Sequence, residues 1–265
     1  MTQRRERTGR NLTRCVSAIV QLSDPHLGAT WNGIDPLPRL QRVVDAVAAL
    51  RPRPDAVLVT GDLTEHGAES EYADIRGALA SLAAPVHVLP GNHDDRAHLR
   101  AAFDLPGDGD EPIQYSVDAG EFRVVVLDTT RPGEDEGDLD AQRLGWLEQE
   151  LATPGDKPVL LAMHHPPLVT GVPVLDRLAL PAPDRGALAR VLAGRDEVAC
   201  VLTGHLHRTI SGRLGRHRVF VAPSTYLQAR LDFELTGLEF ADEPPGFAVH
   251  VAAEGQVATH TATVL

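Results

Sequence analysis

Cysteine is scarce in this sequence, and a long hydrophobic run is absent. Only two of the 265 residues are cysteines, Cys15 and Cys200, and each lies within an apolar stretch. Because a disulfide-stabilised fold needs a denser cysteine framework, we expect both thiols to be reduced and buried. No window approaches the roughly 18 apolar residues that a membrane-spanning helix requires. The sequence therefore predicts a cytoplasmic protein with no membrane partner.

The N-terminal residues 1–14 are basic but lack the apolar stretch of a signal peptide. We expect them to form a disordered basic arm in front of a single domain that spans residues 15–265. A chain of 265 residues with 43% hydrophobic content is long enough to bury the core of one such large domain.

Positive charge is also in short supply, since the formal net charge is -12 and the isoelectric point is about 5.4. A net-acidic surface repels polyphosphate backbones, so a nucleic acid polymer is not expected as a partner. Bound divalent cations reverse the local field, however, and small anionic substrates therefore remain compatible with this composition.

Apolar runs that predict strands recur along the chain, and five of them stop just before a short polar motif. These five lie at residues 16–22, 56–60, 86–89, 159–163 and 198–203, and further strands are predicted at 123–127, 218–222 and 246–252. Helical patterns lie between them, at residues 37–50, 69–82, 97–103, 139–151 and 184–192. This alternation predicts a layered α/β fold, and short turns between the later strands indicate that part of the sheet is antiparallel. The acidic segments 131–140 and 239–245 are expected to be solvated loops.

Five motifs follow these strands, and each supplies a side chain that can hold a divalent cation. In chain order they are Asp24-Pro25-His26, Gly61-Asp62, Gly91-Asn92-His93-Asp94, His164-His165-Pro166-Pro167 and Gly204-His205-Leu206-His207. Carboxylate, amide and imidazole donors form a mixed oxygen and nitrogen set that suits Fe, Mn, Zn or Co. Open α/β sheets place their sites at the carboxyl ends of strands, so we expect the motifs to meet there.

Each motif is weak by itself. Asp24 could be a helix N-cap and Asn92 a turn residue, and the dipeptide Gly-Asp occurs five times in the chain. The shared order at strand ends is what indicates a metal site. In extended backbone, residues i and i+2 project to the same side, so Asp24 with His26, and likewise the two histidines of the last motif, are expected to present ligands together.

With these motifs in place, the sequence resembles the calcineurin-like metallophosphoesterases, and among them the bacterial class III cyclic-nucleotide phosphodiesterases, the mycobacterial group in particular. The resemblance covers roughly residues 16–225 and extends to the stretches 91–96, 127–129 and 144–147. Protein serine/threonine phosphatases share part of the series, but their second motif continues to Asp-Arg-Gly, whereas this chain continues as Leu63-Thr64-Glu65-His66.

The resemblance implies a four-layer α-β-β-α sandwich of two mixed sheets flanked by helices, with the metal site at the carboxyl ends of strands. Residues 226–265 depart most from the group and are expected to be a divergent C-terminal extension. The resemblance is also compatible with a homodimer.

The resemblance further implies roles for individual residues. Two divalent cations, with iron or manganese preferred, would be held in one position by Asp24, His26, Asp62 and His207 and in the other by Asp62, Asn92, His164 and His205. Asp62 would bridge the two cations, as a carboxylate with two oxygens can. His93 would donate a proton to the leaving group or a hydrogen bond to the transition state, and Asp94 would orient its imidazole. The role of His165 stays open between substrate contact, support of a ligand and a backbone hydrogen bond.

The function implied is a metal-dependent phosphodiesterase that hydrolyses small phosphodiesters, with 3′,5′-cyclic nucleotides such as cAMP preferred, through a hydroxide held between the cations. A second enzymatic alternative is a broad phosphoesterase that acts on glycerophosphodiesters, 2′,3′-cyclic nucleotides or monoesters. An alternative of another class is a non-catalytic metal-binding scaffold, which the presence of all seven ligands and His93 disfavours.

Overall fold

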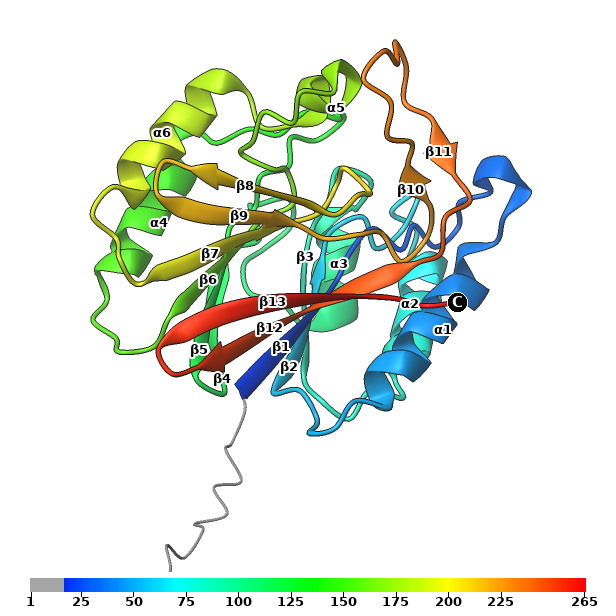
Figure 1. Cartoon of the computed structure of the whole chain (residues 1–265), viewed down its shortest axis with the longest axis horizontal. Helices are drawn as coiled ribbons and strands as arrows, with labels where there is room; N and C mark the ends of the chain where they lie inside the picture. The colour runs from blue at the N-terminus through cyan, green and yellow to red at the C-terminus, as the bar shows by residue number, and fades with distance from the viewer. Residues whose placement is uncertain (1–16) are drawn as a thin grey trace, which may run out of the picture.

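The computed structural model describes residues 17–265 and consists of two β-sheets packed face to face between two sets of helices (Figure 1). The basic arm expected at residues 1–14 lies outside the described residues, as does Cys15. Cys200 is a free, buried thiol, as expected.

The first sheet has five strands in the order β13-β12-β1-β2-β3. Their bounds are Gln256–Thr263, Gly246–Ala253, Ser17–Leu22, Ala56–Thr60 and Val86–Leu89. The pairs β1–β2 and β2–β3 are parallel, whereas β12 is antiparallel to both β1 and β13. The C-terminal strands β12 and β13 thus complete this sheet.

The second sheet has six strands in the order β4-β5-β6-β7-β9-β8. Their bounds are Tyr115–Ala119, Phe122–Val126, Val159–Ala162, Val198–Thr203, His217–Val221 and Ile210–Leu214. The inner strands run parallel, and β4 and β8 are antiparallel edge strands. Both sheets are therefore mixed.

Helices cover the outer face of each sheet and produce the four-layer α-β-β-α order that the resemblance implies (Figure 1). On the first sheet these are α1 (Pro36–Ala48), α2 (Glu69–Leu79) and α3 (Arg96–Phe103). On the second they are α4 (Ala141–Ala152), α5 (Pro173–Leu178) and α6 (Ala182–Leu192). A 3-10 turn, η1 (Trp31–Gly33), and a short pair, β10 (Gln228–Ala229) with β11 (Phe240–Ala241), complete the described elements.

The strand β2 shows why the layers form. All five of its residues are buried. Successive side chains point to opposite faces of the sheet, so both faces must be covered. Val57 and Val59 pack against the helices of the first sheet, whereas Ala56 and Leu58 pack in the core between the two sheets. A continuous apolar run is what a strand covered on both faces requires.

The strands and helices predicted from the apolar patterns are all present, with ends displaced by up to three residues. The expected antiparallel portion is also present, in the β8–β9 hairpin. Among the described elements, the strands β4, β8, β10, β11 and β13, the helix α5 and the turn η1 were not predicted. β13 alternates exposed and half-buried residues at a sheet edge, so it carries no apolar run. Among residues 17–265, no helix combines the length and the apolar character needed to cross a bilayer.

Candidate metal centre

The five motifs meet at the carboxyl ends of β1, β2, β3, β6 and β7, where the two sheets adjoin. Direct contacts join loops that are far apart in sequence. The His205 amide donates to Asp24 Oδ1 at 2.9 Å, and the His93 amide donates to Asp62 Oδ1 at 3.0 Å. The exposed fraction is 0% for Asp24, His26 and His164, 2% for Asp62, 3% for His207 and 8% for His205. Polar groups buried this deeply need partners.

The first group of potential ligands has atoms within 4.8 Å of one another and comprises Asp24, His26, Asp62 and His207. Neighbouring groups set the orientation of both rings. His207 Nδ1 donates to the Leu227 carbonyl at 2.8 Å, and His26 Nδ1 lies 2.9 Å from Glu65 Oε2. In the neutral rings the remaining nitrogens, both Nε2, therefore carry lone pairs, and they face each other at 3.0 Å. A cation satisfies this arrangement.

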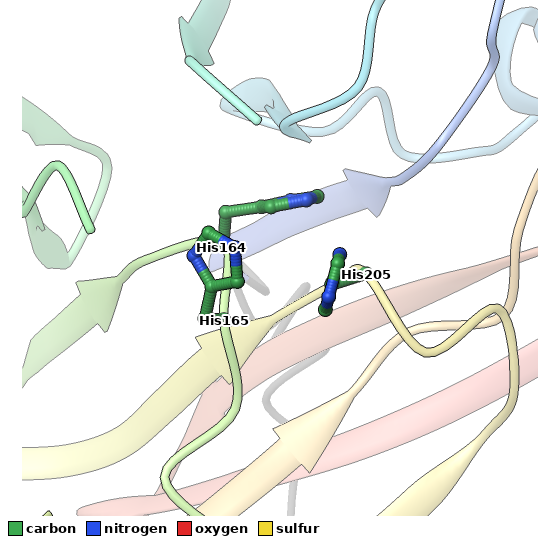
Figure 2. Close-up of side chains that lie close together, drawn as sticks. All are labelled: His164, His165 and His205. Atoms are coloured by element: carbon green, nitrogen blue, oxygen red, sulfur yellow. The ribbon is translucent and has the colours of Figure 1, made fainter. Parts of the chain in front are cut away.

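The second group comprises His164, His165 and His205, whose ligand atoms also lie within 4.8 Å of one another (Figure 2). His164 Nδ1 donates to the Thr60 carbonyl at 2.8 Å, so its Nε2 is free to face Asn92 Oδ1 at 3.2 Å. The Nε2 atoms of His165 and His205, and Asp24 Oδ2 in the first group, are buried without a hydrogen-bond partner among the described residues. These unpartnered atoms fit divalent cations and not a self-contained polar core.

Asp62 lies between the two groups. Its Oδ2 is 3.4 Å from His26 Nε2 and 3.3 Å from His164 Nε2. Burial by itself raises the pKa of Asp62, but the His164 and His26 imidazoles outweigh burial and hold that pKa well below its usual value. The carboxylate is therefore ionised at neutral pH and faces both groups at once.

The backbone at five of the seven candidate ligands is left-handed, not extended. Asp24, His26, Asp62, His205 and His207 have φ angles of 51°, 46°, 49°, 69° and 46°. This conformation costs roughly 1–2 kcal/mol per residue, and such residues concentrate at functional sites. The expectation that i and i+2 project together from extended backbone is therefore wrong in its geometry. Asp24 and His26 do join one group, but the chain turns between His205 and His207 and divides them between the two groups.

Two glycines allow the loops to approach closely. A Cβ at Gly91 would collide with the carboxylate of Asp62, and a Cβ at Gly61 would collide with the His164 ring. Gly61 also has a φ of 88°. Glycine is thus required where the β2 loop contacts the β3 and β6 loops.

Asp94 makes different contacts from those expected. Its carboxylate accepts from the Leu63 and Gly91 amides at 3.1 and 2.9 Å and from the Tyr72 hydroxyl at 3.0 Å, but not from the His93 ring. Sequence neighbours on a tight turn point in different directions, which explains the difference. Asp94 joins the loop of Gly61-Asp62 to the loop of Asn92 and leaves the His93 imidazole to another partner.

That partner is Glu65, a residue that the sequence motifs did not identify. His93 Nδ1 donates to the Glu65 carbonyl at 3.1 Å and lies 3.6 Å from Glu65 Oε2. Glu65 also accepts from Trp31 Nε1 at 3.1 Å, in addition to its contact with His26. Burial lowers the pKa of His93, but the charges of Asp62 and Glu65 outweigh burial and raise it above the usual value.

The two acidic loops border this centre, so the expectation of solvated surface is only partly met. Residues 131–136 are exposed, but Asp135 lies 3.5 Å from Asn92 Nδ2. In the second loop, Phe240 stacks on Trp31 with ring centroids 4.5 Å apart, and Trp31 in turn lies 4.4 Å from the His26 ring. Both loops therefore contribute walls to the site.

A cavity of about 430 Å³ opens beside Asn92 and His93 and is lined further by Thr130 and Arg131. A larger cavity of about 910 Å³ lies at the opposite ends of the strands, next to Ser17, and touches none of the motifs. Of these two cavities, the smaller one adjoins the potential ligands.

Comparisons with known proteins agree with this geometry. The model of a family described as calcineurin-like phosphoesterase matches residues 17–209. The chain is 36% identical to the 3′,5′-cyclic adenosine monophosphate phosphodiesterase CpdA of Pseudomonas aeruginosa, over 79% of this chain and 76% of that protein. It is 33% identical to a protein of Arcobacter nitrofigilis named "Probable glycerophosphodiester phosphodiesterase GpdQ", over 93% of each. Purple acid phosphatase from yellow lupin seeds shares the fold, with a TM-score of 0.64 at 17% identity over 94% of this chain and 54% of that chain.

Proposed function

Because this chain belongs to the calcineurin-like phosphoesterase family, we propose that it is a binuclear phosphodiesterase of small phosphodiesters, with 3′,5′-cyclic nucleotides such as cAMP as preferred substrates. Its reaction class is that of a metal-dependent phosphoric diester hydrolase. The choice of cyclic nucleotides is supported by the relative that is named for cAMP, at 36% identity.

One observation carries the binuclear part of this proposal. Asp62 Oδ2 lies within 3.4 Å of imidazole nitrogens from both ligand groups, His26 on one side and His164 on the other. A single carboxylate shared in this way is what two neighbouring cations require. In this proposal Asp24, His26, Asp62 and His207 hold one cation, and Asp62, Asn92, His164 and His205 hold the other.

Two bound cations, for which we favour iron or manganese, would polarise the phosphoryl oxygens and bring the pKa of a water molecule towards neutrality. The protein's own contribution is to hold the ligands in place before substrate arrives. The carbonyls of Thr60 and Leu227 each fix the ring orientation of one ligand histidine. Ligands oriented by such contacts need no rearrangement during the reaction.

His93 is assigned as the proton donor to the leaving oxygen. Its ring is 30% exposed and lies beside the cavity that Asn92 and Thr130 also line, so a substrate can reach it. The raised pKa of His93 keeps a larger fraction of the ring protonated at neutral pH, which a general acid needs. Glu65 holds the ring through its carbonyl and supports its charge.

The test is a comparison of kcat/KM for 3′,5′-cAMP, 2′,3′-cAMP, glycerophosphocholine and p-nitrophenyl phosphate with purified, metal-loaded enzyme. We expect 3′,5′-cAMP to be the best substrate, and an Asp62→Asn variant prepared in parallel to remove the activity. Turnover of the monoester alone would show that the phosphodiesterase proposal is wrong.

A second candidate is a broader phosphoesterase that favours glycerophosphodiesters. It is supported by the relative named for that substrate, which aligns over 93% of both chains at 33% identity. Under this alternative, glycerophosphocholine would be hydrolysed at least as efficiently as 3′,5′-cAMP in the same comparison.

A further inference from the structure

His165 is a fully buried imidazole that has no role in the mechanism above. It follows His164 at the end of β6, and its exposed fraction is 0%. Thr129 holds it from one side, because the Thr129 hydroxyl oxygen accepts from the His165 amide at 3.2 Å and lies 2.9 Å from Nδ1. Gly137 seals it from the other side, since a Cβ there would come within 2.7 Å of the His165 Cβ.

The opposite ring nitrogen, Nε2, has no hydrogen-bond partner among the described residues. The same is true of His205 Nε2, in a ring whose centroid lies 4.5 Å from that of His165. Buried polar nitrogens in native structures nearly always have a hydrogen-bond partner, so one without a partner requires an explanation. Two of them in neighbouring rings indicate one shared partner.

The chemistry of the cluster indicates that this partner is a cation. Figure 2 shows the rings of His164, His165 and His205 gathered around one space, with His164 and His165 coming from one strand end and His205 from another. When His165 Nδ1 donates to Thr129, Nε2 presents a lone pair to that space. Asp62, next to His164 Nε2 at 3.3 Å, adds negative charge to the same region. Lone pairs and a carboxylate bind a metal ion and repel an anion.

We propose that His165 is a further ligand of the second cation, so that three imidazoles, from His164, His165 and His205, hold it together with Asp62 and Asn92. This inference rests on the proposed binuclear site. With His165 as a ligand, the two cation positions differ in their donor atoms. The first group contains two carboxylates, whereas the second contains three imidazoles. Imidazole-rich sites suit Zn or Co better than Mn, which carboxylate oxygens suit. His165 therefore gives the second position its preference for Zn²⁺ over Mn²⁺.

The test measures stepwise Zn²⁺ and Mn²⁺ affinities of the metal-free full-length chain by competition with a chelator. In His165→Ala we expect one of the two Zn²⁺ dissociation constants to rise by about 100-fold or more, since loss of a group that only supports a ligand already costs 10–100-fold. The other constant should change by less than about threefold, and Mn²⁺ binding should weaken much less than Zn²⁺ binding. The visible spectrum of the Co²⁺ form should also change.

Two matched variants separate ligation from structure. Thr129→Val removes the contact to Nδ1 but leaves the imidazole, so it should weaken Zn²⁺ binding less than His165→Ala does. His217→Gln alters another buried histidine, one that is bonded at both nitrogens to the Val198 and Leu192 carbonyls, and should leave both affinities unchanged. His165→Gln replaces the alanine variant if that variant does not fold.

The ¹⁵N chemical shift of His165 Nε2 during Zn²⁺ titration of the unmodified protein tests the same point without any substitution. An unchanged shift, or two Zn²⁺ affinities that stay within threefold in both His165 variants, would show that His165 is not a ligand. Binding of fewer than two cations by the unmodified protein would instead contradict the binuclear site itself, which is a separate result.

Discussion

The Nε2 atoms of His26 and His207 lie 3.0 Å apart in the interior of the protein. Burial, followed by the influence of His26, lowers the pKa of His207 to about 3, so its ring is neutral at physiological pH. With the His207 Nδ1 proton donated to Leu227, its lone pair points at the other ring. A bound cation would satisfy the lone pairs of both rings, so we expect the stability of the fold to depend on metal binding.

Removal of divalent cations should therefore lower the melting temperature. A ligand present at 100 times its dissociation constant stabilises the native state by about 2.7 kcal/mol, and each kcal/mol raises the melting temperature of a chain of this size by about 2–4 °C. We expect a difference of roughly 5–10 °C between chelator-treated and metal-loaded protein in scanning calorimetry. A His26→Ala variant should show a smaller difference. Identical melting curves with and without metal would contradict this prediction.

Asp62→Asn keeps the shape of the shared carboxylate but removes its charge. We expect both cation positions to weaken and kcat/KM for 3′,5′-cAMP to fall by at least about 10³-fold, or about 4 kcal/mol of transition-state stabilisation. Metal analysis and steady-state kinetics measure the two effects. Asp55→Asn is the control, because that carboxylate bonds Ser17 and Ala18 at the opposite end of the sheet. Retention of both metals and most of the activity in Asp62→Asn would exclude a bridging role.

His93→Ala should affect substrates according to how much their leaving group needs a proton. The alkoxide leaving group of 3′,5′-cAMP is a strong base, so kcat should fall about 10²–10⁴-fold. The p-nitrophenolate of bis-p-nitrophenyl phosphate departs without a proton, and its hydrolysis should slow far less. Asp94→Asn is a useful comparison, because Asp94 organises the loop and does not contact the imidazole. That variant should slow the hydrolysis of both substrates equally. An equal loss for both substrates in His93→Ala would remove the general-acid assignment.

The parts of this site that could be predicted from the sequence are those in which ligand and strand are neighbours along the chain. Asp62 and His164 directly follow buried apolar runs, and that pattern places them at strand ends. The left-handed backbone at His205 could not be predicted, because its φ of 69° depends on contacts with loops more than 100 residues away. The pairing of Trp31 with Phe240 is equally distant in sequence.

The role implied for Asp94 differs from its contacts. Asp94 was expected to orient the His93 imidazole, whereas the carboxylate that reaches the ring belongs to Glu65, on another loop. Propensity and periodicity describe one element at a time, so they carry no information about which loop ends meet.

Glu65→Gln should weaken metal binding although Glu65 is not among the proposed ligands. The carboxylate accepts from His26 Nδ1 at 2.9 Å and so directs Nε2 towards the cluster. Loss of such a supporting carboxylate typically costs 10–100-fold in metal affinity. We expect a loss in this range at one cation position by chelator competition. Glu71→Gln is the matched control on the adjacent helix, because Glu71 bonds His66 and lies outside the ligand groups. Equal affinities in the two variants would show that Glu65 does not support the metal.

Acid should destabilise the fold through His250, which lies outside both ligand groups. The ring is fully buried, with Nδ1 2.9 Å from Thr259 Oγ1 and Nε2 3.0 Å from Gln21 Oε1, and burial together with Arg218 lowers its pKa to about 3. The unfolded chain protonates this ring near pH 6.5. The native state disfavours the charged His250 ring. The contribution of neutral His250 to the free energy of unfolding is therefore complete above pH 6.5 and is lost as the pH falls towards 3.

The expected loss is at most about 1.4 kcal/mol for each pH unit below 6.5. The free energy of unfolding of the unmodified chain and of His250→Gln, both by denaturant titration at pH 7.5, 6 and 5, measures this contribution. As the pH falls, the unmodified chain should lose more free energy of unfolding than the variant, because only the unmodified chain carries the His250 ring. Titration of the other groups contributes equally to both proteins and cancels in the difference. His260→Gln, at an exposed histidine on the neighbouring strand β13, should show no such trend. A difference that is independent of pH would mean that His250 does not couple folding to protonation.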